Sequence, residues 1–234
     1  MAWTADGSAL TDHTSFVRVI NEGASSKRNS NASFPYQHGE HSHFDKFYTA
    51  ADILLEVRLL DDDAFTHLSE LHRMFGKTTG HVTLSRTDRT TQGTVSADVE
   101  LLSDPRASQD RFTYVFPLRN PGGFWEGPVI TTAAGTAPSI TITGDRPVDD
   151  MVVTFAAPGS AVYANAAYGT STLVWGGTGT AIVDVGARTI TKGGSFVDAD
   201  FTVSQPWWLR FAEGETVNLT STANITVDYR NKWA

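Results

Sequence analysis

The sequence predicts a mainly β protein with one α-helix, built from two domains that meet near residue 126. Many short runs alternate apolar and polar residues and are separated by Gly- and Asp-rich turns, which is typical of antiparallel strands. Only one run has the period of an amphipathic helix. From Gly127 onward Thr, Ala and Gly become more frequent and histidine disappears, since all seven histidines lie at or before His81. The predicted domains are residues 1–126 and 127–234.

Length and composition fit a folded chain of two domains. The protein has 234 residues, of which 40% are hydrophobic and 19% charged, so it can bury a core and is not of the disordered class. Cysteine is absent, which excludes disulfides, thiolate metal sites and a cysteine nucleophile. The net charge of −8 disfavours a nucleic-acid or anionic-membrane surface. The polar N-terminus predicts no signal peptide, and no apolar stretch is long and uninterrupted enough to span a membrane.

The first domain is predicted to begin with a strand over residues 16–20, followed by a long polar loop or arm over residues 21–43. The next strand, residues 53–60, has a strict alternation that places Ile53, Leu55, Val57 and Leu59 on one buried face. A connection as long as residues 21–43 is unusual in a compact domain and is typical of functional loops.

The helix is predicted directly after this strand. Asp61, Asp62 and Asp63 supply carboxylates for the N-cap and for the positive end of the helix dipole. Ala64, Leu68, Leu71 and Phe75 fall on one face, and Gly76 stands where a left-handed C-terminal residue is expected.

The remaining strands of the first domain are predicted from the same alternation. Residues 82–84 and 95–101 form a hairpin around the turn at residues 89–93, and residues 112–118 form a strand that is apolar on both faces. Asn120-Pro-Gly-Gly123 ends that strand, and residues 124–126 close the domain.

The second domain is predicted to be an antiparallel sandwich or jelly roll without helices. Its expected strands include residues 140–142, 153–155, 182–185, 209–211 and 225–229. No internal repeat is present.

The order of these elements resembles the distal tail proteins of long-tailed, siphovirus-type bacteriophages. The resemblance rests on strand, polar loop, strand, Asp-capped helix, hairpin and Pro-Gly-Gly-Phe-Trp at 121–125, followed by an all-β domain. In that domain it rests on residues 135–144 and 180–188, on the Trp207-Trp-Leu-Arg-Phe-Ala-Glu-Gly214 run, on residues 217–219, and on the ending at residues 225–233. The His-rich segment at residues 37–43 matches no feature of that family.

This resemblance implies a tail-tube-like, ring-forming domain over residues 1–126 and a galectin-like β-sandwich over residues 127–234. The implied function is that of a structural protein, not an enzyme, whose hexameric ring joins the tail tube to the tail tip or baseplate hub. The implied partners are further copies of the chain, the tail tube protein, the tip or hub protein and host-receptor-binding proteins. DNA would pass through the lumen as cargo, and the protein, made in the host cytoplasm, would reside in the virion. No catalytic residue, cofactor or metal is expected.

The histidines at the His-rich segment are the best candidates for a metal site. His38, His41 and His43, with Glu40, carry ligand atoms two and three residues apart, as one ion bound by a turn requires. An exposed polar loop explains the same residues, because the sequence shows no further ligand and no supporting second layer. We favour the polar loop.

Other polar and glycine-rich motifs have structural explanations. The three aspartates at 61–63 suit a helix start better than a catalytic site. Asp149, Asp150, Asp198 and Asp200 lie in turn-like segments without the spacing of a calcium loop. The glycines of residues 176–179 precede a strand and not a helix, so they predict a hairpin turn and not a phosphate site.

A carbohydrate-binding module with an accessory domain is the main alternative function, and a β-sandwich glycosidase is a third. Trp175, Trp207, Trp208 and Trp233 could stack on sugar rings, although tryptophan is also common in cores and subunit contacts. A glycosidase would need two opposed carboxylates, which a sequence does not reveal.

Overall fold

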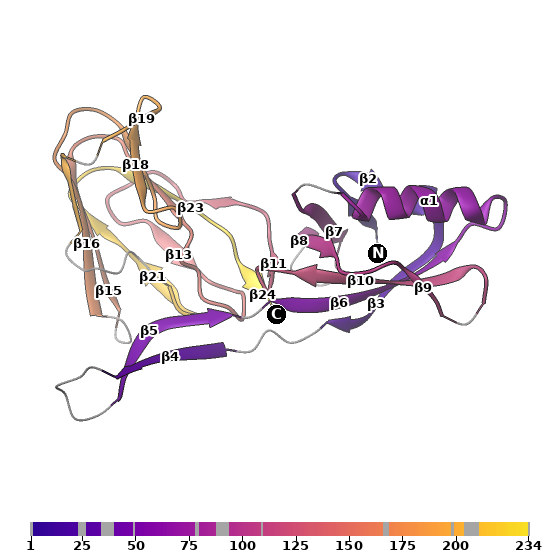
Figure 1. The fold of residues 1–234 in the computed structure, drawn as a ribbon. Helices are drawn as coiled ribbons and strands as arrows, with labels where there is room; N and C mark the ends of the chain where they lie inside the picture. The colour runs from indigo at the N-terminus through magenta and orange to yellow at the C-terminus, as the bar shows by residue number, and fades with distance from the viewer. Residues whose placement is uncertain are drawn as a thin grey trace. The chain divides into compact units, whose positions relative to one another are not determined.

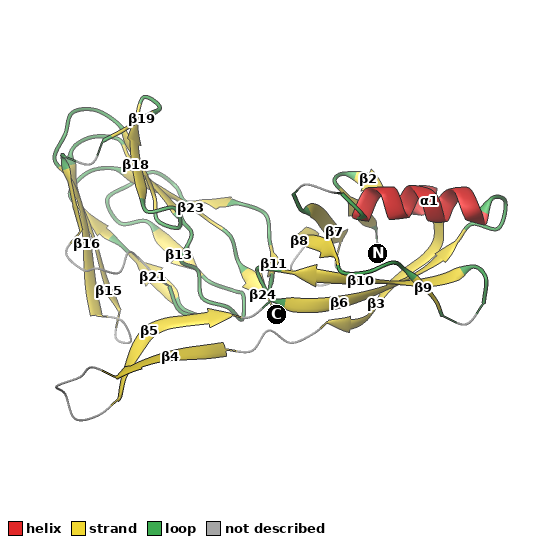
Figure 2. Cartoon of the chain, viewed as in Figure 1, coloured by secondary structure: helices red, strands yellow, loops and turns green. Residues whose placement is uncertain are grey.

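The structure is a computed structural model that describes residues 2–22, 27–33, 40–48, 50–77, 80–87, 94–108, 110–165, 169–197, 199–203 and 211–233. The chain divides into two compact units, one running to Gly127 and the other from Pro128 to Trp233. We call them the N-terminal and C-terminal units. Both consist of antiparallel strands, and α1 (Ala64–Phe75) is the one α-helix among the described residues (Figures 1 and 2). The predicted mainly β fold with a single helix is confirmed.

Among its described residues, the N-terminal unit contains α1, one short 3-10 helix and eleven strands. In chain order the elements are β1 (Trp3–Ala5), β2 (Ser8–Ala9), η1 (Leu10–Asp12), β3 (Thr14–Glu22), β4 (Lys27–Ser33), β5 (Glu40–Tyr48), β6 (Ala51–Leu59), α1, β7 (Val82–Thr87), β8 (Thr94–Leu101), β9 (Arg106–Ala107), β10 (Thr113–Asn120) and β11 (Trp125–Glu126). The predicted strands at residues 16–20, 53–60 and 112–118 correspond to β3, β6 and β10. The predicted hairpin is formed by β7 and β8, which pair from Val82 opposite Val99 to Thr87 opposite Thr94.

The main sheet follows the order β2-β1-β7-β8-β10-β6-β3, with β9 beside β10 and β11 beside β8. β8 and β10 are joined by only two residue pairs at their ends, whereas β10 and β6 pair along eight. The alternation of β6 buries Ile53, Leu55, Val57 and Leu59, as predicted. Glu56 on its other face is buried too, and its carboxylate contacts the side chains of Arg18 on β3 and Ser108.

Helix α1 packs on this sheet through its last two turns. Leu71 and Phe75 are buried, and the rings of Phe75 and Phe116 lie 5.4 Å apart between centroids. No helix of the described residues is long and apolar enough to cross a membrane. An amphipathic helix of three turns has one apolar stripe, and here a β-sheet covers it.

The prediction of a left-handed Gly76 is wrong, although glycine is needed there. Gly76 has φ −86°, and its N–H donates to the His72 carbonyl at 2.7 Å. A Cβ at this position would lie 2.6 Å from the same oxygen. The close approach of the backbone to the last helical turn, and not a positive φ, therefore requires a residue without a side chain.

Residues 21–43 are predicted to be a long polar loop or arm, and a loop is wrong for their described parts. These parts belong to β3, β4 and β5, and β4 pairs with β5 as a two-stranded antiparallel sheet. β4 has the sequence Lys-Arg-Asn-Ser-Asn-Ala-Ser, without the apolar alternation from which strands are predicted. Backbone hydrogen bonds to a facing strand form with any side chains, so a polar segment can pair without a sequence signal.

The C-terminal unit contains thirteen strands in the described residues and no helix. They are β12 (Ile130–Thr131), β13 (Ser139–Thr141), β14 (Val152–Phe155), β15 (Gly159–Asn165), β16 (Gly169–Trp175), β17 (Ala181–Asp184), β18 (Thr189–Lys192), β19 (Ser195–Phe196), β20 (Phe201–Val203), β21 (Thr216–Asn218), β22 (Thr220–Ser221), β23 (Ile225–Tyr229) and β24 (Lys232–Trp233). One sheet has the order β12-β23-β14-β17-β18-β19, a second β20-β16-β15-β22, and β13 pairs with β21. Both larger sheets contribute to one core, which makes the unit a β-sandwich.

The core of this unit joins apolar residues of the two larger sheets. Val153 and Phe155 come from the first sheet, and Leu173 and Trp175 come from the second. The strands predicted at residues 140–142, 153–155, 182–185 and 225–229 are present. Phe211, predicted as part of a strand with Leu209, forms an isolated bridge with Val148, and Leu209 lies outside the described residues.

Candidate functional site

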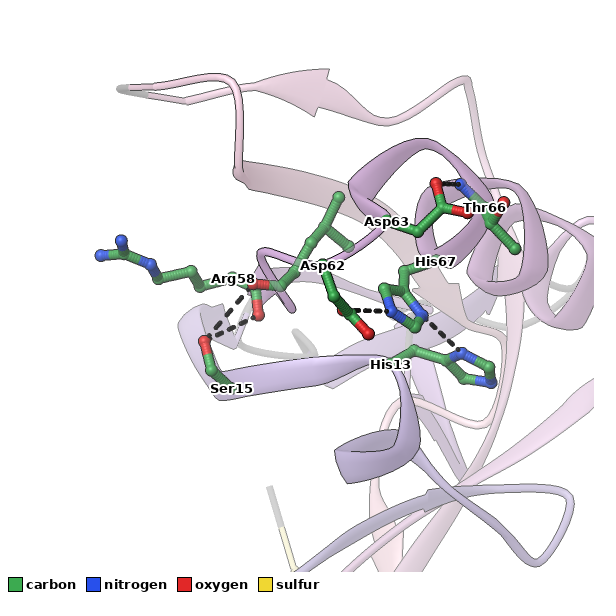
Figure 3. Close-up of polar contacts among 8 residues, drawn as sticks. His13, Ser15, Arg58, Asp62, Asp63, Thr66 and His67 are labelled. Carbon is green, nitrogen blue, oxygen red and sulfur yellow. Dashed lines mark hydrogen bonds and ion pairs between the residues drawn. The ribbon is translucent and has the colours of Figure 1, made fainter.

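A polar cluster joins the start of α1 to the turn before β3 (Figure 3). Nδ1 of His13 lies 3.2 Å from Nδ1 of His67, and Nε2 of His67 lies 3.0 Å from Oδ1 of Asp62. The side chain of His67 is 15% exposed and that of Asp62 is 79% exposed. The hydrogen bond from His67 is the main cause that holds the pKa of Asp62 below its usual range. The cluster is therefore a chain of two imidazoles that ends on a carboxylate.

Asp63 caps α1, as the sequence predicts for one of the three aspartates. Its Oδ1 accepts a hydrogen bond from the Thr66 N–H at 3.3 Å (Figure 3). Hydrogen bonds from Thr66, first from its side chain and then from its backbone, lower the pKa of Asp63. Asp61 and Asp62 are exposed beside it. Two of the aspartates thus have different roles: Asp63 caps the N-terminus of α1, and Asp62 forms a hydrogen bond with His67.

The histidines of the predicted metal candidate are only partly described. His38 lies outside the described residues, and Glu40, His41 and His43 belong to β5, whose side chains are also outside them. Within the described part of the chain, no group of three or more His, Asp or Glu side chains could hold a metal ion.

A buried ion pair lies between β3 and β6, 38 residues apart in sequence. The Nε atom of Arg18 lies 2.6 Å from Oε2 of Glu56, and the Ser108 hydroxyl donates to Oε1 at 3.3 Å. The Arg18 side chain is 54% exposed, whereas that of Glu56 is 8% exposed. A buried carboxylate needs such partners, because an unpaired charge away from water costs several kcal/mol. Nothing in the sequence indicates this pair, since Glu56 falls on the face of its strand expected to be polar and exposed.

Replacing Arg18 by methionine is expected to lower the free energy of unfolding of the N-terminal unit by about 1–3 kcal/mol, because Glu56 would lose its charged partner. Urea denaturation at neutral pH measures the change. Arg119→Met is the matched control, since Arg119 and Glu100 are both about half exposed and 4.0 Å apart. Equal losses in the two variants would contradict a special role for the Arg18–Glu56 pair.

Asp149 and Asp150 of the C-terminal unit have a structural partner in Lys232. The Nζ atom of Lys232, whose side chain is 4% exposed, lies 2.8 Å from Asp150 and 3.4 Å from Asp149. Asp198 lies outside the described residues, and the backbone carbonyl of Asp200 accepts from Gly176 N–H at 2.7 Å. Asp149 and Asp150 thus neutralise a buried lysine, which accounts for the Asp-Asp pair without calcium.

The prediction of a hairpin turn at residues 176–179 is wrong, because β16 and β17 belong to different sheets. The segment crosses from one layer of the sandwich to the other, and the indole N–H of Trp175 donates to the Gly179 carbonyl at 2.9 Å. A Cβ on Gly177 would lie 2.2 Å from the Trp175 ring. The glycine run therefore makes room for a buried tryptophan.

Trp175 is 1% exposed and lies in the core, so it offers no face to a sugar ring. Trp233 is partly buried, and Trp207 and Trp208 lie outside the described residues. In the N-terminal unit, the Arg86 guanidinium lies 4.4 Å from the Trp125 ring centroid and 6.0 Å from that of Trp3. These contacts are structural packing. Among the described tryptophans named here, none offers a fully exposed ring face on which a sugar could stack.

The whole chain is similar in fold to a solved phage structure. The crystal structure of the SPP1 Dit (gp 19.1) protein, described as a paradigm of the hub adsorption apparatus in phages that infect Gram-positive bacteria, superposes with a TM-score of 0.68. The alignment covers 100% of this chain and 99% of that one, at 15% sequence identity. The chain has the fold of the SPP1 Dit protein.

Two structures of the phage P2 baseplate in its activated conformation, one with Ca and one with Sr, match more weakly. Each has a TM-score of 0.47 and 10% identity, and covers 98% of this chain and 97% of the other. No protein-family model and no curated protein matches the sequence. The Dit fold is thus recognised in three dimensions, and the coverage of both chains shows that the likeness includes both units.

Proposed function

We propose that this chain is a non-enzymatic structural protein of a phage tail, located in the virion at the hub between the tail tube and the tail tip or baseplate. The full-length likeness to the SPP1 Dit protein supports this function. Three groups of side chains agree with it: Asp63 caps a helix, Lys232 pairs with Asp149 and Asp150, and Trp175 packs in a core. The first unit would be the ring-forming, tail-tube-like domain and the second a galectin-like sandwich.

The ring would be a hexamer closed by head-to-tail contacts of the N-terminal unit. A cyclic assembly needs two different complementary faces on each subunit. β3 is the last strand in the sheet order, so one of its edges has no strand partner among the described residues. Phe16 and Ile20 on this strand are 47% and 44% exposed. An edge strand with exposed apolar side chains is a surface on which another chain can pair, and it supports β3 as one face of the ring contact.

The lumen of such a ring would pass the genome without binding it. The net charge of −8 for each subunit favours a neutral or acidic inner wall, which would not retain phosphates. The tail tube protein and the tip or hub protein would contact the two ends of the ring, and host-receptor-binding proteins would be further partners.

The oligomeric state tests this proposal. We expect light scattering of the full chain to give a mass six times the 25.3 kDa of one subunit, or electron microscopy to show the protein in a sixfold ring of the assembled tail. The double variant Phe16→Asp, Ile20→Asp should lose the ring, because two charges on each edge strand would repel the facing chain. Phe65→Asp is the matched control, since Phe65 is 80% exposed on α1. A monomer at every concentration, with no ring in assembled tails, would refute the proposed function.

A further inference from the structure

We propose that His13 and His67 form a proton-limited pair, which holds a single N–H between its two facing nitrogens and loosens the attachment of helix α1 when the protein is acidified. The pair lies where the 3-10 turn before β3 meets the first turns of α1 (Figure 3). This inference concerns one contact within the N-terminal unit, and it holds whether or not the chain forms a ring.

The geometry of the two rings is that of a hydrogen bond. The Nδ1 atoms are 3.2 Å apart, while the ring centroids are 5.5 Å apart with an angle of 57° between the planes. With 3.2 Å between the Nδ1 atoms, a centroid separation of 5.5 Å requires both nitrogens to lie near the line that joins the two ring centroids. Their lone-pair directions then point at each other, as for one shared proton, and not at a common third point, as two ligands of one metal ion would.

Asp62 fixes which nitrogen carries hydrogen. An ionised carboxylate only accepts hydrogen bonds, so Nε2 of His67, at 3.0 Å from Asp62, must be the donor. In a neutral His67 the Nδ1 atom is then an acceptor, and Nδ1 of His13 donates to it. Neutral His67 and neutral His13 are therefore compatible with every contact in the cluster.

A first added proton is also compatible with the contact. Placed on Nε2 of His13, it leaves one N–H between the two Nδ1 atoms. A second proton has only the remaining Nδ1 lone pair available, so two N–H groups would face each other across 3.2 Å. The pair can therefore bind two protons only if the rings separate.

Backbone contacts tie the two rings to different elements. The backbone carbonyl of His13 accepts from the Leu60 N–H at 3.2 Å, and the backbone N–H of His13 donates to the Leu10 carbonyl. The backbone N–H of His67 donates to the Asp63 carbonyl in the first helical turn at 3.1 Å. The elements around the pair carry the following charged residues: Asp12 of the 3-10 turn, Asp61, Asp62 and Asp63 before the helix, Glu70 and Arg73 on it, Arg18 and Glu22 of β3, and Asp52, Glu56 and Arg58 of β6. These groups are mostly acidic, but they do not relieve the clash of two facing N–H groups.

The direction of the pH effect follows from the proton count. With the rings apart, each imidazole has a free lone pair, so the open state can bind two protons in acid, whereas the closed pair binds one. The open state therefore takes up one proton more than the closed state in acid. The closed contact is weakened as the pH falls through the range in which imidazoles gain their proton.

Hydrogen–deuterium exchange of the full chain tests the inference, with mass spectrometry of peptides from residues 64–75. The critical variant is His13→Asn, whose amide can donate to a neutral His67 or accept from a protonated one. Each comparison is made between wild type and variant at the same pH, so intrinsic exchange rates cancel. Measurements at pH 7.5 and pH 5.8 remain above the isoelectric point of about 5.3.

Between these two pH values, the opening equilibrium of α1 in the wild type should rise about fivefold relative to that in His13→Asn. His72→Asn is the matched control, because His72 lies on the same helix and bonds Asp104 at 3.1 Å, away from the pair. It should behave as the wild type does. A wild-type to His13→Asn ratio that is the same at both pH values would overturn the inference, as would a loss of the effect in His72→Asn. Circular dichroism at pH 7.5 verifies that all three proteins are folded.

Discussion

Replacing Trp175 by alanine is expected to lower the free energy of unfolding of the C-terminal unit by about 3–5 kcal/mol. The indole is 1% exposed and is packed among residues of both sheets of the sandwich. Its loss would leave a cavity that the surrounding strands can fill only in part. It would also leave the Gly179 carbonyl without the hydrogen bond that the indole donates at 2.9 Å.

Differential scanning calorimetry of the full chain measures this effect. Phe196→Ala is the matched control, because Phe196 is 71% exposed in the same unit and its removal should change stability by less than about 0.5 kcal/mol. If Trp175→Ala were as stable as this control, Trp175 would not be a core residue. The hypothesis that Trp175 stacks on a sugar ring would then have to be reconsidered.

Replacing Phe116 by alanine is expected to lower the free energy of unfolding of the N-terminal unit by a similar amount, about 3–5 kcal/mol. Phe116 is fully buried on β10 and faces Leu55 of β6 in the strand register. Its ring also contacts that of Phe75, which is the last residue of α1. The substitution removes a side chain of the sheet that packs against the helix. We therefore expect α1 and the sheet to lose stability together.

Calorimetry again gives the measurement, and Phe65→Ala is the control on the solvent side of the same helix, where Phe65 is 80% exposed. We propose that the two units unfold independently, so Phe116→Ala should shift one transition and Trp175→Ala the other. A single transition that both substitutions shift equally would show instead that the units share one cooperative core.

Some elements could be predicted from the sequence because their signals are local. β6 has an apolar residue at every second position, and α1 has an N-cap aspartate followed by apolar residues at helical spacing. Both elements match their predicted residues to within a few positions. The same local reasoning missed β15 and β16, since Ala, Ser, Thr and Gly dominate these strands and give little apolar alternation.

The candidate sites were harder to predict, because their members are distant in sequence. Arg18 and Glu56 are 38 residues apart, and His13 and His67 are 54 apart. In the sequence, His67 is only a polar position within the predicted helix. The residues next to it in the chain do not indicate that a second imidazole lies beside it in the fold. The histidines that did attract attention, at 38, 41 and 43, stood out because they are close in sequence, which is a weaker criterion than closeness in space.

The sequence by itself determined the mainly β class, the position and the N-cap of the one helix, and the burial pattern of β6, because propensity, capping and side-chain period act over a few residues. Only the tertiary structure decided that β4 and β5 pair, that residues 176–179 cross between sheets, and that Gly76 and Gly177 are needed for close approach. Strand pairing and close approach depend on which surfaces meet, and neighbouring residues in the chain do not encode that choice.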